Sequence, residues 1–572
     1  MVLFNLLKPG RTLAIIAFAL YLVSCGLFNE PSQYEYSYSS EANRYKIDFG
    51  NNSEKTITLE NLSGRSVFLV TVNTSGVPAL AGNIGSSYSI NTARSIEGDT
   101  GSAEITSPVR PISVEGDGLV SGAFTGPDGT ITRLEHPGAR EFSRNPPALP
   151  VADRSVRGAA RSSQGQAFSY AVGASRQFWV EDKAAVWKQI EAKLRASSTH
   201  ANVWIPDENY NANGDGKNTL SYSQAQAVAV KFDAIYQYDT AIFGYEYGGN
   251  LSVDDPNYGG IDGDPKIQIL VYDIDGDYTS GQTSGIFGYF WGKDLYKDGT
   301  SLPSRSNEAE IFYIDSYFTE SYPDAIYSTL AHEFQHMINF NVKRIEKGLS
   351  SGTWYDEMLS MLAEDMIVPL IGIGPDSPDH PIKNRIPLFL SAYWYAGPAE
   401  WSSGDNVLIS YSNTYAFGAY LARNYGGAGL IREIARNNAV NKDSVDAALK
   451  IYGSSWDNAV SRYGEAFIFS GTSKPSGCVS FDNTVSSTIN GTAYTFAAFD
   501  IWKMLNRDKE VFGSNYSNSL GPAVFEGNTQ YAMRPYSVLV RSYTHWRKVN
   551  GNITITVRKP VDTNIELYVM TR

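Results

Sequence analysis

Two histidines and a glutamate within residues 331–340 have the types and the spacing of a metal-binding, proton-transferring site. The stretch reads AHEFQHMINF, and His332, Glu333 and His336 form the pattern H-E-x-x-H. Residues four apart lie on one face of an α-helix, about one turn apart, so both imidazoles can face one metal ion. Glu333, beside them, can take a proton from a metal-bound water. The chain has only six histidines, so this spacing favours a metal site over two histidines and a solvated glutamate on a surface helix.

The third ligand is expected on the next helical stretch, because a catalytic zinc uses three protein ligands and one open position for water. Residues 354–366 read WYDEMLSMLAEDM and place Glu357 and Glu364 on one helical face. The words HEFQHMINF and W-x-x-E-x-x-S-x-x-A-E resemble the hyicolysin family of zinc metallopeptidases, and the order of the two helices resembles the gluzincins. The resemblance covers about residues 178–427. It departs from the family pattern where this chain has Asp-Glu-Met in place of Asn-Glu-Gly.

The resemblance implies a role for each of these side chains. Glu333 would act as general base and acid. Glu364 and Asp365 are alternatives for the carboxylate ligand, and Glu364 is expected instead to accept a hydrogen bond from a ligating imidazole. By this resemblance the zinc ligands are His332, His336 and Glu357.

A later tyrosine-bearing helix is expected to complete the catalytic group. Residues 411–427 have helical spacing and stop at a Gly-Gly pair. They resemble the tyrosine-bearing helix that follows the ligand helix in gluzincin-like enzymes, where a hydroxyl stabilises the tetrahedral oxyanion. Tyr415 is the first candidate and Tyr411 the second. The alternative for either one is a packed core or rim aromatic.

The elements before the metal helix indicate an α+β catalytic domain. Strand-like runs at residues 176–180, 200–206, 266–272 and 310–315 alternate with helical patterns at 184–195 and 221–238. By the resemblance, these elements form the mixed sheet of a zincin-type domain, and a helical lobe follows the metal helix. The strand at residues 311–315 would then be an edge that pairs with an extended substrate. The alternative is a fully paired interior strand.

Changes in pattern along the chain predict the domain boundaries. Alternating strands separated by turn residues indicate small β-sandwich-like domains on either side of the catalytic region. Residues 136–167, between the first β-domain and the catalytic region, form a linker rich in proline. Its scattered arginines could invite proteolytic processing; the alternative is an ordinary solvated linker. The expected order is a signal peptide at 1–25, an N-terminal β-domain at 26–135, a linker at 136–167, the metallopeptidase domain at 168–475 and a C-terminal β-domain at 476–572.

The first 25 residues have the pattern of a bacterial lipoprotein signal. Lys8 and Arg11 precede an apolar run at residues 13–23, which is too short to span a bilayer comfortably. The run ends in Leu-Val-Ser-Cys, which resembles a lipobox with Cys25 as the lipidated residue. We therefore expect export and a lipid anchor to the membrane, at the outer membrane or cell surface. The alternatives are an ordinary secretory signal or a signal anchor.

Composition and the acidic loops bear on two further kinds of partner, nucleic acid and calcium ions. The net charge is −13 and no basic patch stands out, so a nucleic-acid partner is not expected. Asp262-Gly263-Asp264 and the acidic run at residues 273–277 supply the hard oxygen ligands that Ca²⁺ prefers. Neither has the full twelve-residue calcium loop, so structural calcium is the alternative to ordinary turns after strands.

These observations together predict a zinc-dependent endopeptidase, tethered to a membrane, that acts on protein or peptide substrates. The first alternative is a non-catalytic surface binding protein or adhesin on a zincin-like scaffold, which the departure at Asp-Glu-Met and the flanking β-domains would suit. The second is a metal hydrolase that acts on a non-peptide substrate, which H-E-x-x-H alone does not exclude.

Overall fold

The computed structural model describes most of the catalytic region and parts of both flanking regions. Cys25 and the predicted signal, residues 1–25, lie outside the described residues, as does His545. No helix within the described part of the chain is both long and apolar enough to cross a membrane. The described residues are 37–38, 44–82, 84, 87–91, 110–111, 132–134, 136–144, 146–147, 169–214, 217–299, 305–402, 406–526, 532–542 and 548–572.

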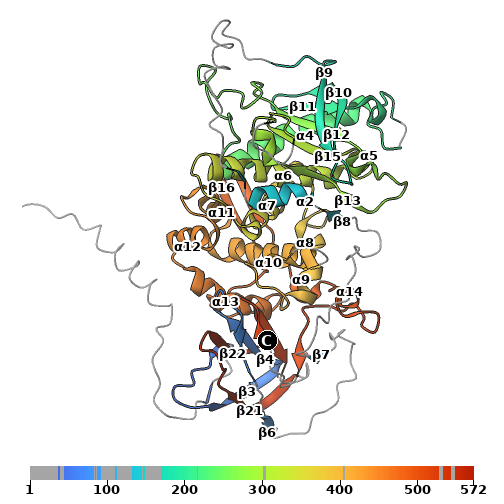
Figure 1. Cartoon of the computed structure of the whole chain (residues 1–572). Helices are drawn as coiled ribbons and strands as arrows, with labels where there is room; N and C mark the ends of the chain where they lie inside the picture. Colours follow the sequence, from blue (N-terminus) through green and yellow to red (C-terminus); the bar gives the residue numbers. More distant parts are fainter. Residues whose placement is uncertain are drawn as a thin grey trace, which may run out of the picture.

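A six-stranded mixed sheet lies at one end of the molecule, beside the helix that carries the two histidines (Figure 1). Its strand order is β14-β15-β12-β11-β10-β9. The central strands β11, β12 and β15 are parallel and buried along their whole length, as expected for strands covered on both faces. The outer pairs are antiparallel. The strands are β9 (Ser175–Glu181), β10 (Trp187–Ser197), β11 (Ala201–Ile205), β12 (Ile267–Tyr272), β14 (Gly288–Phe290) and β15 (Ile311–Asp315).

Two expectations about this sheet are wrong. Residues 184–195 were expected to be helical, but strand β10 occupies most of them. Its buried positions Ala192, Leu194 and Ala196 alternate with less buried ones, and in a short window such a pattern overlaps with helical spacing. The strand before the metal helix, β15, is interior, and β14 and β9 are the two edge strands of the sheet.

Two long helices pack on the sheet and a third packs against the second of these; the second and third carry His332, His336 and Glu357. Helix α4 (Tyr222–Phe243) begins with a capping box, in which Ser221 and Gln224 exchange side-chain and backbone hydrogen bonds. It packs on β10, β11 and α6. Helix α6 (Pro323–Asn339) has proline at its first position, where no N–H is needed, and continues into a π-helical turn, η4 (Phe340–Ile345). Helix α7 (Thr353–Ile367) packs against α6.

The region after α7 is mostly helical. Helix α10 (Val407–Tyr425) packs against α7 and α9, and a hairpin of β16 and β17 packs on α11. This arrangement confirms the α+β class. The remaining elements of the catalytic region are η1 (Asp207–Asn209), η2 (Ile274–Gly276), η3 (Gly292–Leu295), α5 (Ser316–Ser321), η5 (Val368–Ile371), α8 (Pro381–Asn384), α9 (Ile386–Ala392), α11 (Gly427–Arg436), α12 (Asn441–Ile451), α13 (Trp456–Phe469), β16 (Val485–Ile489), β17 (Thr492–Phe496), η7 (Ile501–Lys503) and α14 (Asp508–Phe512).

Strands from both ends of the chain form two common sheets at the opposite end of the molecule (Figure 1). Strand β3 (Glu54–Arg65) pairs with β21 (Val549–Arg558), and β4 (Val67–Asn73) lies between β20 (Val538–Ser542) and β22 (Ile565–Thr571). This pairing corrects the expectation of two separate β-domains, because alternation marks a strand without naming its partner. The other strands here are β1 (Ser37–Tyr38), β2 (Arg44–Lys46), β5 (Ala79–Leu80), β6 (Ser87–Asn91), β7 (Arg110–Pro111), β18 (Phe525–Glu526) and β19 (Ala532–Met533).

The predicted linker at residues 136–167 begins with structure. Helix α2 (Pro137–Arg144) packs against η3 and α7, and just before it β8 (Thr132–Leu134) pairs in parallel with β13 (Ser284–Ile286). Composition alone suggested a solvated linker, but Ala139 and Phe142, three residues apart, give α2 a buried face.

Candidate active site

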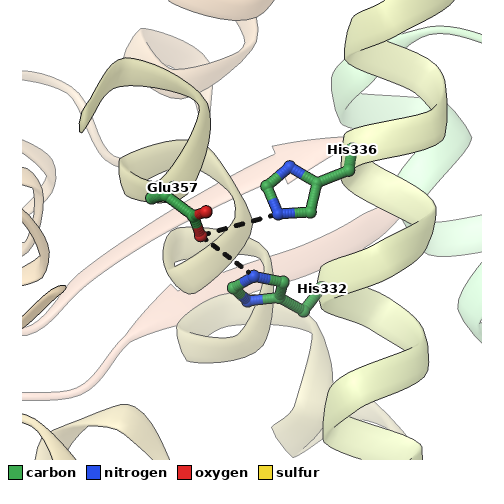
Figure 2. Close-up of side chains that lie close together, drawn as sticks. All are labelled: His332, His336 and Glu357. Atoms are coloured by element: carbon green, nitrogen blue, oxygen red, sulfur yellow. Dashed lines mark ion pairs between the residues drawn. The ribbon is translucent and has the colours of Figure 1, made fainter. Parts of the chain in front are cut away.

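Helix α6 holds His332 and His336 on the side that faces α7 (Figure 2). Their ring centroids are 4.7 Å apart, as the i, i+4 spacing predicts. The side chain of His332 is fully buried, and that of His336 is 12% exposed. The two imidazoles are therefore fixed by one helical turn, and one of them reaches toward solvent.

Glu357 extends from α7 toward both imidazoles. Its Oε2 atom lies 3.2 Å from Nε2 of His332 and 3.5 Å from Nε2 of His336. One donor atom from each of the three residues lies within 4.8 Å of the other two. Two imidazole nitrogens and one carboxylate oxygen are the ligand set of a His₂Glu catalytic zinc site. The residues present therefore fit the metal that the sequence predicts.

Each imidazole has a carboxylate behind it. Nδ1 of His332 lies 2.6 Å from Oε1 of Glu364, the position that the sequence analysis gave to Glu364. Nδ1 of His336 lies 3.1 Å from Oδ2 of Asp356. Such partners fix which ring nitrogen faces the metal. No role is predicted for Asp356 from the sequence, although the chain departs from the family pattern beside Glu357, and that departure is a signal that could have identified it.

The carboxylates of Asp356 and Glu357 change the pKa of His336. Burial lowers the pKa, but the charges of Asp356 and Glu357 outweigh burial and raise it well above the usual value. The ring therefore holds a proton readily when no cation is near. A metal ion must displace that proton, so metal binding and proton release are coupled.

Glu333 lies at the edge of the same site, between α6 and the sheet. Its Oε2 atom accepts a hydrogen bond from the backbone N–H of Phe290 at 2.9 Å. Phe290 is the last residue of the edge strand β14. This contact fixes the Glu333 carboxylate beside the group of His332, His336 and Glu357, here called the metal-binding group, and ties it to an edge strand of the described sheet. The sequence analysis did not identify the contribution of Phe290.

The structure separates the two tyrosine candidates. The hydroxyl of Tyr415 donates to Oδ2 of Asp365 at 2.9 Å, and this side chain is fully buried between α10 and α7. The hydroxyl of Tyr411, one helical turn earlier, donates to Oε1 of Glu357 at 3.4 Å. This geometry corrects the order of preference, because only Tyr411 contacts a residue of the metal-binding group. Helical spacing did not reveal which turn of α10 faces that group.

Asp365, an alternative for the carboxylate ligand, faces away from the histidines. Its oxygens accept hydrogen bonds from the guanidinium of Arg423 at 2.9 and 3.1 Å. Both side chains are fully buried. Asp365 therefore balances a cation of the chain itself, and Glu357 is the carboxylate that reaches both imidazoles.

A small cavity of about 40 Å³ opens beside Glu333, His336 and Glu357. Tyr289 and Phe290 of strand β14 line it on one side. His136, Ala139 and Ser143, from the segment before the catalytic domain, also line it. Residues that the sequence assigned to a linker thus lie over the metal-binding group.

The acidic loops make contacts within the chain. Asp262 pairs with Arg176 at 3.0 Å, and Asp264 accepts a hydrogen bond from Asn202 at 2.9 Å. Asp273 accepts one from Asn218 at 3.1 Å. Within the described residues, only the group of His332, His336 and Glu357 brings three such donors this close together. Structural calcium remains a prediction.

Known proteins resemble the region that contains this site. The sequence profile of the family described as Peptidase M30 matches residues 182–484, more than half of the chain. The chain is also 30% identical over 271 residues to a neutral metalloprotease, ShpI, of Staphylococcus hyicus. The alignment covers 45% of this chain and 53% of that protein, so the chain spans about half the length of its curated relative. The profile match includes α6, α7 and α10 and leaves out α2.

Proposed function

We propose, because the chain belongs to the peptidase M30 family, that it is a zinc-dependent endopeptidase with Glu333 as its general base. One observation carries this proposal. Donor atoms of His332, His336 and Glu357 converge within 4.8 Å, and the carboxylate of Glu333 lines the cavity beside them. A metallopeptidase needs these two features side by side.

His332, His336 and Glu357 would hold the zinc. When bound there, zinc would polarise the scissile carbonyl and make a water molecule acidic enough to attack near neutral pH. Glu333 would take the proton from that water and pass it to the leaving amine, which is general base and then general acid catalysis. Glu364 and Asp356 would keep the two imidazoles in the tautomer that presents Nε2 to the metal.

The edge strand β14 supports the choice of a peptide as substrate. An extended peptide can add to a free sheet edge through backbone hydrogen bonds, which do not depend on its sequence. Phe290 ends this strand and donates to Glu333, so a peptide along β14 would pass the base. We extend the proposal to a zincin-type architecture, in which this sheet and α6 form one wall of the cleft.

Tyr411 is the proposed donor to the oxyanion. Its hydroxyl donates a hydrogen bond to Oε1 of Glu357 at 3.4 Å, and the side chain is buried. The hydroxyl is therefore held near the metal-binding group through a carboxylate and not through an imidazole. A preorganised hydroxyl aimed at developing negative charge lowers the barrier to acyl transfer.

The test is Glu333→Gln in the full chain. This change keeps the side-chain shape but removes the base, so zinc content should stay near one ion per chain while casein hydrolysis falls by about a hundredfold or more. The matched control is Glu208→Gln, which makes the same change at an exposed position. Undiminished hydrolysis by the Glu333→Gln protein would refute the assignment. Hydrolysis of esters but not of casein would favour a non-peptide hydrolase. Absence of both bound zinc and hydrolysis would favour a binding protein.

We also propose that the chain is exported and anchored through a lipid on Cys25. This proposal rests on the sequence alone, on the apolar run followed by Leu-Val-Ser-Cys. Labelling of cells with a radioactive fatty acid should mark the wild-type chain and leave the Cys25→Ser variant unmarked. Equal labelling of both would contradict it.

A further inference from the structure

The cavity above the metal-binding group is too small for a peptide. Its volume is about 40 Å³. A single water needs roughly 10–15 Å³ by the same kind of measure, whereas ligand pockets commonly have roughly 300–1,000 Å³. The space beside Glu333 can therefore hold a few waters. A substrate can reach this site only if part of the wall moves.

The part of the wall that does not belong to the family match is a stretch we call the covering segment, which comprises Thr132–Leu134, His136–Arg144 and Pro146–Pro147. Its strand β8 pairs with β13, which lies two residues before β14. Its helix α2 then crosses to α7, the helix of Glu357. The covering segment thus extends from the edge-strand side of the site to the ligand side.

Aromatic side chains hold the start of α2 against the edge strand. The imidazole of His136 packs against the rings of both Tyr289 and Trp291, with centroids 4.5 and 4.7 Å away. Its Nδ1 accepts a hydrogen bond from the N–H of Ala139 at 3.3 Å, inside the first turn of α2. Its Nε2 lies 3.5 Å from Oε2 of Glu181. His136 therefore occupies a slot with aromatic walls and a carboxylate at one end.

The helix and its exit are also fixed to the catalytic domain. A Cβ atom on Gly138 would lie 2.9 Å from the ring of Trp291, so only glycine allows α2 this close to the indole. The ring of Phe142 meets that of Tyr296 edge to face at 5.5 Å. Beyond α2, the carbonyls of Pro146 and Pro147 each accept a hydrogen bond from Arg344 at 3.1 Å.

We propose that the covering segment is autoinhibitory: it fills the peptide-binding cleft of its own chain and must leave before a substrate can bind. We include in the proposal that the slot of His136 is a substrate subsite for an imidazole or aromatic side chain. Both parts rest on the proposed peptidase function. Arg344 belongs to η4, the continuation of α6, so the covering segment is fastened to the edge strand at one end and to the metal helix at the other.

The test is Gly138→Leu in the full-length, zinc-loaded protein. Leucine favours helix, so its effect comes from the clash with Trp291 and not from lost helix propensity. The matched control is Glu141→Leu, which adds the same residue on the exposed side of α2. A site open in only a fraction of molecules reacts in proportion to that fraction, so Gly138→Leu should accelerate both zinc extraction by 1,10-phenanthroline and casein hydrolysis by about tenfold or more. Glu141→Leu should match the wild type in both rates.

The extraction rate separates this proposal from the proposed function. It should rise equally when Gly138→Leu is placed in the Glu333→Gln background, where no hydrolysis is expected. Faster extraction with no casein cleavage by any variant would overturn the peptidase proposal and keep the covering segment. Unchanged extraction and hydrolysis in a Gly138→Leu protein that folds and binds zinc would overturn autoinhibition. If that variant fails to fold, Phe142→Ala, which removes the contact with Tyr296, takes its place with the same expected outcomes.

A synthetic peptide of residues 136–147 tests the subsite. It should inhibit casein hydrolysis by the Gly138→Leu protein, because it can return to the vacated cleft. The same peptide with His136→Ala should bind about tenfold more weakly, as expected when one buried aromatic contact is lost. Equal inhibition by both peptides would overturn the assignment of the slot as a subsite.

Discussion

Helix α7 buries acidic side chains on two faces, and the two faces balance their charge in different ways. Toward α6, three carboxylates of α7 face the two imidazoles of His332 and His336. Toward α10, Asp365 faces the guanidinium of Arg423 and the hydroxyl of Tyr415. The second face is neutral within the chain. The first keeps an excess of negative charge even with both rings protonated, and that excess is what a divalent cation would neutralise.

The comparison shows that burial alone does not identify a metal ligand. Glu364 and Asp365 are neighbours in sequence, and both were alternatives for the third ligand. One residue of helix rotation, about 100°, sends the first toward His332 and the second toward Arg423. The partner that each carboxylate meets, and not its depth, decides its role.

The largest effect is expected on the metal-facing side. Glu357→Gln removes the only carboxylate of the described residues that reaches both imidazoles, so zinc affinity should fall by more than the roughly 100-fold that loss of an outer partner causes. Casein hydrolysis should disappear with it. Zinc content after dialysis against a chelating buffer checks the first result. A Glu357→Gln protein that keeps one zinc ion per chain would contradict the assignment of the metal to the face of α7 toward α6.

The next effect is expected on the opposite face, in stability. Asp365→Asn leaves the buried guanidinium of Arg423 without its countercharge, which should lower the free energy of unfolding by about 3–5 kcal/mol. Urea unfolding of the zinc-free protein measures this. Asp376→Asn, which removes the exposed pair with Lys383, is the control and should change stability little. The two faces would not differ as described if Asp365→Asn left stability unchanged and removed zinc binding.

A smaller effect is expected from the carboxylate behind the second imidazole. Asp356→Ala removes the carboxylate partner of Nδ1 of His336, which also lies 3.1 Å from Oγ of Ser360, and should weaken zinc binding by about 10–100-fold. Asp356→Asn keeps an acceptor oxygen and should lose less. Competition with a zinc chelator of known affinity ranks the three proteins. Identical affinities would show that Asp356 does not orient the ring.

A separate effect, on the pH dependence of stability, concerns a buried acid that lies outside the metal-binding group. Burial raises the pKa of Glu246 from 4.5 to about 7, although Tyr236 donates a hydrogen bond to it. The folded protein therefore holds a proton between these values that the unfolded chain releases, and stability should fall as pH rises from about 4.5 to 7. Glu246→Gln should remove this loss and be more stable than the wild type at pH 8 by up to about 3 kcal/mol. Urea unfolding at pH 5 and pH 8 checks it; parallel pH dependence in both proteins would contradict it.

The sequence could predict the site better than the fold around it. Spacing along one helix predicts that His332 and His336 share a face, whereas the roles of Glu357 and Glu364 follow from the resemblance to a known family. Tyr415 was preferred to Tyr411 because periodicity does not say which turn of α10 meets α7. Residues 184–195 have a helical spacing although they form most of strand β10, because short apolar patterns fit both periods.

What sequence reasoning missed are contacts between distant segments. Nothing in a proline-rich stretch says that it will lie over a cleft assembled from residues 289–357. Likewise, the alternation in β3 marks a strand but not its partner, and the two β-segments were assigned to separate domains. Non-local pairing is decided by complementary surfaces that a single sequence does not display.

The shared sheets cannot be completed until the C-terminal strands have been synthesised. The hydroxyls of Thr56 and Thr556 hydrogen-bond at 2.9 Å across 500 positions of sequence. At a synthesis rate of roughly 5–20 residues per second, the first waits about 25–100 s for the second to be made. Throughout that interval β3 and β4 present open edges that other chains can join. The catalytic region is thus translated before the two shared sheets can be completed. A premature stop before β21 would leave it attached to two incomplete sheets.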